Sequence, residues 1–173
     1  SASQAALNIT LGSNAVAKAK VSTTADISGT TFDSDVTHLT VAASKTATLS
    51  ASQAALNITL GSNAVAKLGI GSNTDVSSLT LDSDVSEFVV SSGTLTVSTA
   101  QATGRTISGA GNVTVNALAT NANLSNVSAS GTITANIAAT GDYSANSNIS
   151  TVDAFVVAAS KTATLSSAQA AKS

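Results

Sequence analysis

The amino-acid sequence predicts an all-β protein wound as a parallel β-solenoid, in which successive coils of the chain stack on one another. Two observations carry this prediction: the chain contains long internal repeats, and its apolar residues recur in short alternating runs. Residues 1–18 (SASQAALNITLGSNAVAK) return unchanged as residues 50–67, at an offset of 49. Residues 26–41 return in related form as residues 75–90 at the same offset. Such a period is typical of solenoids, because one repeat cannot bury its apolar face without a neighbour.

A third copy follows after a longer interval. Residues 38–54 recur as residues 87–102, one residue shorter, and again as residues 154–170. The glutamines that mark the copies are Gln4, Gln53, Gln101 and Gln169, at intervals of 49, 48 and 68 residues. We therefore expect a single repeat array over residues 1–173, with copies at approximately 4–52, 53–100 and 101–168.

The long interval contains an extra sub-repeat around residues 111–137. Residues 131–137 (GTITANI) match residues 111–117 (GNVTVNA) at an offset of 20. In a stack of coils, one more sub-repeat lengthens the stack and leaves the flanking pattern intact. In β-sandwich repeats, which are the alternative fold, the insertion would form a loop or displace a strand. The number of strands per coil stays open, because coils of 20 residues do not divide 49 evenly and two coils of about 24 also fit.

Short runs in which apolar residues alternate with Ser, Thr or Asn indicate β-strands. The predicted strands are residues 39–41, 46–49, 56–60, 77–81, 87–90, 94–97, 112–118 and 132–138. The segments GSN, SGAG and TGD between them supply residues that tolerate a positive φ at corners. Residues 49–57 (LSASQAALN) predict either a helical turn, N-capped by Ser50 or Ser52, or a corner of the solenoid.

The composition favours a narrow core without large side chains. Aromatic residues make up 2% of the chain and charged residues 9%, whereas 43% of the residues are hydrophobic. Wide cores rely on aromatic side chains that bury about 150–250 Å² each, while Val, Ile, Leu and Ala suit a thin stack. Disorder is the alternative for a chain rich in Ser, Thr and Gly, but the dense β-branched content argues against it. The residues expected to point inward are Val41, Leu49, Ile58, Leu60, Val90, Val97, Ile107, Val113, Val115, Ile133, Val157 and Leu165.

Charge and hydropathy argue against several classes of partner. The formal charge of −2 and the scattering of the seven basic residues argue against nucleic-acid binding. No apolar run approaches the roughly 20 residues that cross a bilayer, so we expect no transmembrane segment. The absence of Cys excludes disulfides and thiolate metal sites. Because the chain opens at Ser1 without an initiator methionine or a signal peptide, we expect a mature or excised piece.

The sequence offers no constellation of residues for catalysis. A nucleophile needs a suitable base beside it. The single histidine, His38, is replaced by Glu87 and Ala154 in the other copies, so it lies outside the repeat pattern. We expect no enzymatic activity, no catalytic residue and no cofactor-binding residue.

Two Asp-Ser-Asp motifs form the candidate metal site. They contain Asp33 and Asp35 in one copy and Asp82 and Asp84 in the next, at an offset of 49. In an extended strand residues i and i+2 share a face, so each motif can present two carboxylates to one cation. Stacked coils would then bring four carboxylates together as oxygen ligands for Ca²⁺. The alternative is that these aspartates are turn residues that keep the surface hydrated.

Several segments resemble a known class of proteins. The motifs TATLSSAQA, GRTISGAGNVTVNALA, NLSNVSASGTITANI and FVVAASKTATLS are similar to the Ala/Thr/Ser/Val-rich β-strand repeats of large bacterial cell-surface, adhesin-like and S-layer-like proteins. The resemblance covers essentially the whole chain. It implies secretion to the bacterial cell surface and a role in a coat, stalk, adhesin or filament. The GGxGxD calcium repeats that often accompany such proteins are missing.

These observations lead us to expect a structural extracellular protein, which is a subunit or segment of a bacterial surface layer, sheath or filament. The alternative is an adhesin stalk or a ligand-binding module that contacts glycans or a cell surface. An enzyme that acts on polysaccharide is disfavoured because sugar-binding grooves usually contain aromatic side chains. The first residues, SASQAAL, and the last, ATLSSAQAAKS, fall at nearly the same phase of the repeat. We therefore expect self-association through end-to-end stacking, or covalent continuation into further repeats.

Overall fold

The computed structural model describes residues 10–172 and has an all-β fold, a parallel β-solenoid of about seven turns. Strands that are neighbours in each sheet run parallel, as β1 and β3 do in one sheet and β11 and β13 in another. The predicted fold class is confirmed. The alternative, a β-sandwich with antiparallel strands, is not observed in the described residues.

The chain divides into two compact units. The first unit comprises the chain up to Gly69 together with Thr80–Glu87. It contains the sheet β1-β3-β5, and the strands β2, β4 and β6 are consecutive members of a second sheet. The strands are β1 (Ala17–Val21), β2 (Ala25–Asp26), β3 (Val36–Val41), β4 (Thr46–Leu49), β5 (Asn57–Leu60) and β6 (Val65–Ile70). The last residue of β6, Ile70, belongs to the second unit, and β8 (Val85–Val90) likewise begins in the first unit and ends in the second.

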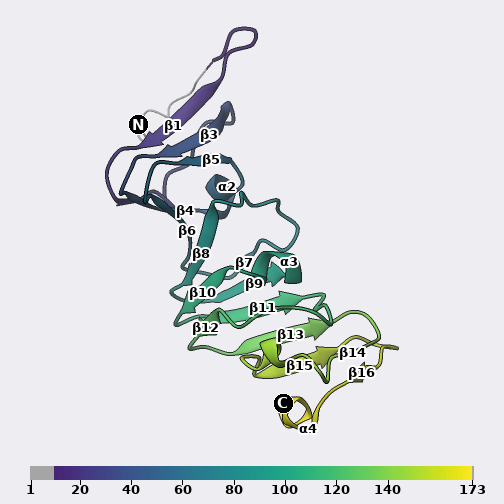
Figure 1. The fold of residues 1–173 in the computed structure, drawn as a ribbon. Helices are drawn as coiled ribbons and strands as arrows, with labels where there is room; N and C mark the ends of the chain where they lie inside the picture. Colours follow the sequence, from purple (N-terminus) through teal and green to yellow (C-terminus); the bar gives the residue numbers. More distant parts are fainter. Residues whose placement is uncertain (1–9, 173) are drawn as a thin grey trace. The chain divides into compact units, whose positions relative to one another are not determined.

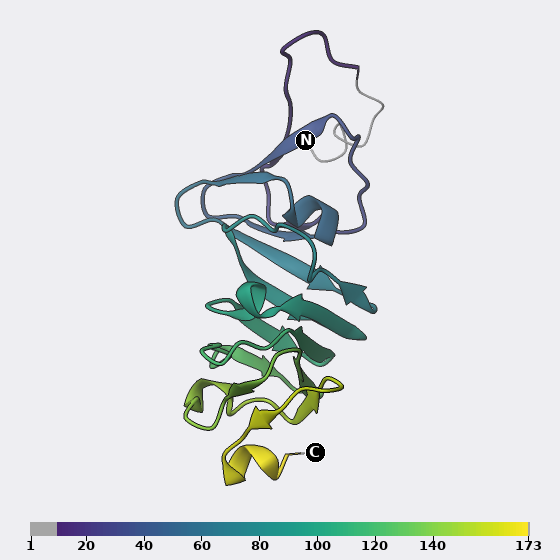
Figure 2. The ribbon, with the colours of Figure 1, turned by 90° about the vertical axis from the view of Figure 1, so that its right-hand side faces the viewer.

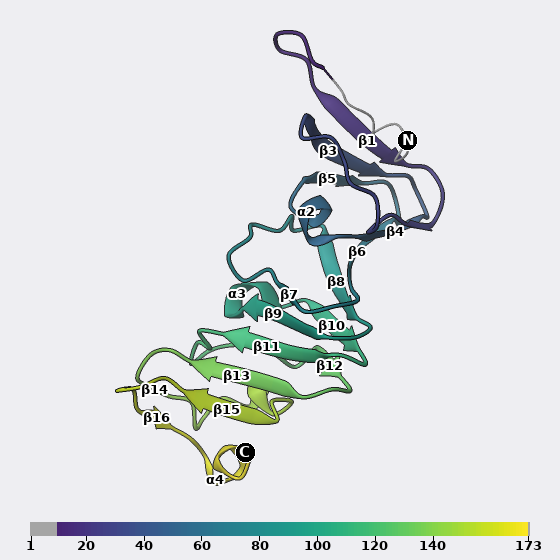
Figure 3. The ribbon, with the colours of Figure 1, turned by 180° about the vertical axis from the view of Figure 1, so that it is seen from behind.

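The second unit comprises Ile70–Leu79 and the chain from Phe88 onward. One sheet has the order β15-β13-β11-β9-β7, and Figures 1 and 3 show β9, β11, β13 and β15 stacked side by side. β10 pairs with β12, and β14 pairs with β16. The bounds are β7 (Thr74–Asp75), β9 (Thr94–Ser98), β10 (Thr106–Gly109), β11 (Asn112–Asn116), β12 (Val127–Ala129), β13 (Ile133–Ile137), β14 (Gly141–Asp142), β15 (Ala154–Val157) and β16 (Ala163–Thr164).

The strand register gives the length of one coil. Paired residues are about 20 positions apart: Leu39 pairs with Ile58, and Val113 pairs with Ile133. In the first unit the odd-numbered strands form one sheet and the even-numbered strands the other, so each coil contributes two strands. The extra sub-repeat is therefore one whole coil, because β11 and β13, which carry its two copies, are direct neighbours in the sheet.

The 49-residue repeat spans two and a half coils, which explains why the coil length does not divide it evenly. Lys18 lies on β1, in the sheet β1-β3-β5. Its identical counterpart, Lys67, lies on β6, five strands later and in the other sheet of the same unit. Successive copies of the repeat thus place the same sequence on alternate faces of the coil.

The core follows the predicted pattern except at Leu60 and in the last coil. Nine of the twelve residues expected to point inward are less than one tenth exposed, namely Val41, Leu49, Ile58, Val90, Val97, Ile107, Val113, Val115 and Ile133. Leu60 and Leu165 are half-buried, and Val157 is 39% exposed. Val157 and Leu165 both belong to the coil of β15 and β16, where no described strand lies on the outer side.

The helical turn predicted once per repeat is confirmed, with Ser50 rather than Ser52 as its N-cap. It recurs directly after β9 and β16, the two strands that repeat β4 in the later copies. The three turns are α2 (Ala51–Ala54), α3 (Thr99–Ala102) and α4 (Ser167–Ala170), and a short 3₁₀ helix, η1, covers Ser147–Ile149. Because the turns have only four residues each, they act as corners and not as packing elements.

One predicted strand is wrong: residues 77–81 form a turn. The carboxylate of Asp75 accepts a hydrogen bond from the backbone N–H of Ser77 at 2.8 Å. The N–H of Leu79 then donates to the carbonyl of Val76 at 2.9 Å. Side-chain capping of this kind competes with strand pairing, and the alternation of Leu79 and Leu81 does not reveal it.

Positive φ angles occur at some of the predicted corners. Asn14 and Asn63, in two of the three GSN segments, have φ of 62° and 56°, whereas Asn73 in the third is not among the positive-φ residues. Gly109 of the SGAG segment has φ of 115°. Gly141 of the TGD segment is not among the positive-φ glycines, so that expectation is wrong. The short polar side chain of Asn tolerates the left-handed conformation, as expected.

Candidate functional site

Buried glutamines sit at the third position of each helical turn. Gln53 is 2% exposed, and Gln101 and Gln169 are each 7% exposed. Ser98 and Gln101 form a reciprocal capping box, in which Gln101 N–H donates to Ser98 Oγ at 3.3 Å and Ser98 N–H donates to Gln101 Oε1 at 2.8 Å. This Ser-x-x-Gln pattern satisfies two backbone donors at the start of the turn.

The same glutamines join consecutive coils. Gln101 Nε2 donates to the carbonyl oxygens of Val76 and Leu79, at 2.6 and 2.8 Å, in the preceding coil. Gln53 and Gln169 make the equivalent pair of bonds, to the carbonyls of Ile27 and Thr30 and to those of Tyr143 and Asn146. Among the described residues no buried side-chain nitrogen or oxygen lacks a hydrogen-bond partner. The sequence marks these glutamines as repeat anchors, but their burial was not predicted from it.

Asp-x-Ser turns position the backbone carbonyl groups that accept hydrogen bonds from the glutamines. Asp26 Oδ1 accepts from both the hydroxyl and the backbone N–H of Ser28, at 2.6 and 2.9 Å, and Asp142 does the same with Ser144. Both hydrogen bonds lower the pKa of Asp26, and the bond from the Ser28 hydroxyl has the larger effect. These turns hold Ile27 and Tyr143 with their carbonyls directed at Gln53 and Gln169.

The candidate calcium ligands lie in turns that precede β3 and β8, and not in extended strands. Asp33 Oδ1 accepts from Asp35 N–H, and Asp82 Oδ1 accepts from Asp84 N–H, both at 2.9 Å. The four residues therefore do not lie in extended strands, and the premise that each pair shares one face of a strand is wrong. Within residues 10–172 no three His, Cys, Asp or Glu side chains gather as metal ligands. Calcium binding stays a prediction of the sequence.

Asp82 also links two coils of the first unit. Its Oδ2 accepts a hydrogen bond from the backbone N–H of Ile58 at 2.9 Å, and its own N–H donates to the carbonyl of Ala54 at 2.9 Å. Ile58 belongs to β5, and its side chain is buried. The carboxylate therefore satisfies a backbone donor at the edge of the core.

Asp82→Asn is expected to lower the free energy of unfolding by about 1–3 kcal/mol, because the single amide oxygen of Asn cannot accept from both Ile58 N–H and Asp84 N–H, which the two carboxylate oxygens of Asp82 accept. Asp84→Asn is the matched control, since it removes the same charge from the same turn without touching the Ile58 contact. Urea unfolding of both variants with and without EDTA measures the difference. A loss that disappears in EDTA would show that a bound cation, and not this hydrogen bond, is the stabilising contact.

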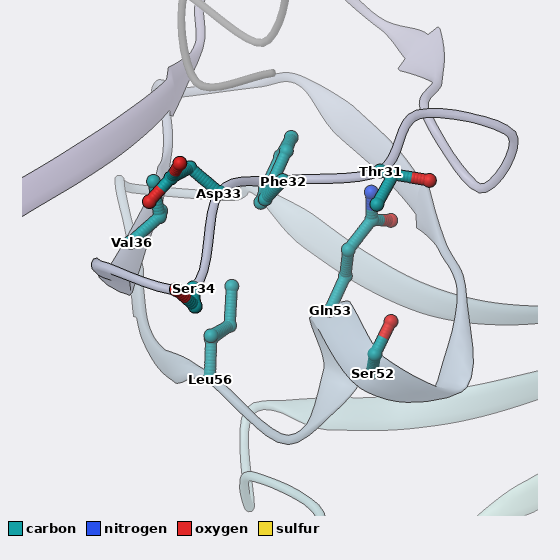
Figure 4. A pocket seen from close by; sticks show the side chains of 8 residues that line it. All are labelled: Thr31, Phe32, Asp33, Ser34, Val36, Ser52, Gln53 and Leu56. Carbon is teal, nitrogen blue, oxygen red and sulfur yellow. The ribbon is translucent and has the colours of Figure 1, made fainter. Parts of the chain in front are cut away.

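A cavity of about 270 Å³ lies beside Gln53 in the first unit. Figure 4 shows the loop of Thr31, Phe32 and Asp33 on one side and Ser52, Gln53 and Leu56 on the other. The complete lining is Thr31, Phe32, Asp33, Ser34, Val36, Ser52, Gln53 and Leu56. An equivalent cavity of about 290 Å³ lies beside Gln169 in the second unit. Each lining combines apolar side chains and hydroxyl groups with one charged residue, Asp33 in the first and Lys172 in the second.

The cavity does not contain His38. That side chain lies on β3, where Lys18 is its partner on β1, and its Nδ1 is 2.9 Å from the Thr37 hydroxyl. In the second copy of the repeat, Lys67 and Glu87 take these two places and form an ion pair at 2.9 Å. The position therefore holds cross-strand polar pairs on the outside of the coil.

The last coil of the second unit has an uncovered face. Val156 and Val157 of β15 are 51% and 39% exposed, whereas Val41 and Val90, the counterparts of Val157, are fully buried. Among the described strands β15 pairs only with β13, and β16 pairs only with β14. In Figure 2 this coil is the last of the second unit, followed only by the turn α4.

Comparisons with known proteins yield no relative: no family model matches the chain, and no curated protein or solved structure matches it significantly. None of the helices that the structure describes has the length and apolar character needed to cross a membrane.

Proposed function

We propose that this chain is a structural protein, a subunit or segment of a bacterial surface layer, sheath or filament that assembles by stacking β-coils. The observation that carries the proposal is the uncovered face of the coil formed by β15 and β16. Its strand edges have no described partner, and its core positions are open. A location outside the cell, at the bacterial surface, follows from the resemblance of the repeats to those of surface proteins.

The physical reason is that an open coil face favours a further coil. Unpaired N–H and C=O groups along a strand edge form a template for pairing, which proteins usually blunt with Pro, Lys or a covering segment. The chain contains no Pro, and β15 carries no charged residue. Burying a Val side chain contributes about 1.5–3 kcal/mol, so covering Val157 and its neighbours stabilises the contact.

No catalytic role is proposed. The hydrogen bonds of the buried glutamines and of Asp82 join one coil to the next, and in each case the groups are used for structure. The glutamine contacts recur at Gln53, Gln101 and Gln169, as expected for an architecture that is extended by adding coils.

A Lys in place of Val157 tests the proposal. We expect the wild-type chain to form ordered polymers at high concentration, and Val157→Lys to stay monomeric, because a charge would be buried in the contact. The fold should survive, since Val157 is 39% exposed in the isolated chain. Sedimentation velocity and electron microscopy measure the assembly. Ala159→Lys, in the exposed loop after β15, is the control and should assemble like the wild type.

A wild-type chain that remains monomeric at high concentration would contradict the proposal. The second candidate function would then gain support: a ligand-binding surface module that uses the cavities beside Gln53 and Gln169. Isolated particles that bind glycans, with binding lost on filling the cavity through Ser52→Leu, are the result expected of that function.

A further inference from the structure

We propose that the coil formed by β15 and β16, called the uncovered coil below, binds the first coil of a second copy of this chain. The strands of the two copies would pair in the register by which β6 pairs with β4. This inference rests on the proposed function and specifies the partner and the contact. One side of the contact is residues 162–165, which contain β16, and the other is residues 16–19, at the start of β1.

Both halves of the β4–β6 contact recur in the sequence. Residues 158–166 (AASKTATLS) are identical to residues 42–50, which contain β4. Residues 16–18 (VAK) are identical to residues 65–67, the first three of β6. The chain therefore carries a second β4-type edge near one terminus and a second β6-type edge near the other.

The observed β4–β6 pairing supplies the register. Thr46 pairs with Val65, Ala47 with Ala66, Thr48 with Lys67 and Leu49 with Leu68. Transferred to the identical segments, this register pairs Thr162 with Val16, Ala163 with Ala17, Thr164 with Lys18 and Leu165 with Ala19 of the second copy. It also directs Val16 N–H to the carbonyl of Lys161, as Val65 N–H donates to Lys45 at 2.9 Å.

Both edges are open in the described chain. β1 pairs only with β3, whereas its counterpart β6 lies beside β4 in the sheet of the even-numbered strands. Val16 is 54% exposed, while its counterpart Val65 is half-buried. On the other side, Leu165 is half-buried, whereas Leu49 is fully buried under β6. The proposed contact would cover the apolar side chains that lack a neighbour on each side.

The segment before β1 extends the contact to β15. In the first unit, Thr59 and Leu60 pair with Thr40 and Val41. Thr10 and Leu11 are the counterparts of Thr59 and Leu60, since residues 1–18 repeat as 50–67. The same register thus places Leu11 of the second copy against Val157, which is exposed in the isolated chain.

The intermolecular contact differs from its intramolecular template at two positions. Ala19 and Lys20 stand where β6 has Leu68 and Gly69. A Cβ at Gly69 would meet the Thr48 methyl at 2.6 Å, so Thr164 must turn its methyl away from Lys20 of the second copy. The contact between copies is therefore weaker than the contact within a chain, which makes assembly dependent on concentration. Because each copy uses two different surfaces, a dimer still has one open surface of each kind and can add further copies.

Disulfide trapping tests the register, since the chain contains no Cys. Neighbouring strands are about 4.8 Å apart, within the Cα–Cα range of roughly 4.4–6.8 Å that a disulfide spans. Val16→Cys combined with Thr162→Cys should give a ladder of oligomers on non-reducing gels, which collapses on reduction. Each single variant should give at most dimers. Val16→Cys combined with Ala159→Cys, three residues out of register, is the matched control and should form at least tenfold less of the ladder.

The outcomes separate this inference from the proposed function. Polymers in the microscope without an in-register ladder, or with an equal ladder from the Ala159 control, overturn the register and leave the structural function standing. Monomers at every concentration overturn both. A ladder specific to the Val16 and Thr162 pair, with a spacing of one chain per step, supports both.

Discussion

Replacement of Gln101 by Leu is expected to lower the free energy of unfolding by about 3–5 kcal/mol. The substitution leaves two part-buried backbone groups without these partners, the carbonyl of Leu79 and the N–H of Ser98. It also leaves the Val76 carbonyl with only the hydrogen bond from Leu79 N–H. Each unsatisfied buried group costs about 1–3 kcal/mol. Leu has a volume similar to that of Gln, so the loss reports on the hydrogen bonds and not on a cavity. Urea unfolding followed by circular dichroism measures it.

The same substitution at Gln169 is the matched comparison. Gln169 makes the equivalent bonds, to the carbonyls of Tyr143 and Asn146, but its turn belongs to the last coil of the second unit. Water reaches those groups more easily once the side chain is changed, so we expect a loss about half as large. Equal losses at both positions, or a loss below 1 kcal/mol for Gln101→Leu, would contradict the account of coil-to-coil bridging.

Gly109→Ala is expected to be at least as damaging, with a loss of about 3 kcal/mol or more. Gly109 has φ of 115°, which side chains on L-residues rarely adopt. A Cβ there would lie 2.3 Å from the carbonyl oxygen of Val90 and 2.7 Å from its carbonyl carbon. Backbone strain of this kind costs on the order of 1–3 kcal/mol, and the overlap with a neighbouring backbone adds to it. The Val90 carbonyl cannot move freely, because it accepts from Gly111 N–H at 2.8 Å.

Alanine variants of two other glycines distinguish the cost of the backbone conformation from the cost of steric overlap with the neighbouring coil. Gly104 has φ of 78° with nothing within 4 Å of the added Cβ, so Gly104→Ala measures the cost of the conformation. Gly71 has no positive φ and meets only the Ser91 hydroxyl, at 4.0 Å, so Gly71→Ala should be close to neutral. Thermal melting of the three variants should rank them with Gly109→Ala least stable. A melting temperature for Gly109→Ala equal to that for Gly104→Ala would show that the close approach of the coils is absent.

The stacking of coils could be predicted from the sequence because equivalent positions of stacked coils carry similar residues, which appear as internal repeats. The sub-repeat within residues 111–137 recurs at an offset of 20 and leaves the flanking pattern intact, which fits a whole added coil. The pairing of β11 with β13 confirms it. The helical turn was predictable from Ser50 and its spacing to Gln53. In both cases one local pattern, read by simple geometry, specifies the structure.

Other features depend on contacts that the sequence does not display. Alternation in residues 77–81 suggests a strand, but the Asp75 carboxylate caps a turn there. The aspartates of the Asp-Ser-Asp motifs were placed on strands, whereas Asp82 folds back onto Asp84 and reaches Ile58 in another coil. The burial of the glutamines depends on carbonyls more than 20 residues away, which no local pattern indicates. Repeats of two and a half coils become visible only when the strands are assigned to sheets.

The uncovered coil shows a different kind of limit. Val157 repeats Val41 and Val90 in sequence, so the pattern predicts the same burial for all three residues. Its exposure arises because no described strand follows β15 in the sheet. Sequence periodicity indicates which side chains face the interior of a coil, but burial also requires a coil on each side. The exposure of Val157, compared with the burial of Val41 and Val90, therefore marks a coil that is covered on one side only.

X-ray fibre diffraction from aligned wild-type polymers tests the central claim, that chains assemble by continuing the stack of parallel β-coils, most directly. Neighbouring strands in a sheet are about 4.8 Å apart, and in this assembly the strands lie across the filament axis. We predict a strong reflection near 4.8 Å along that axis. Polymers whose 4.8 Å reflection lies perpendicular to the axis, or which lack it, would contradict coil stacking as the mode of assembly.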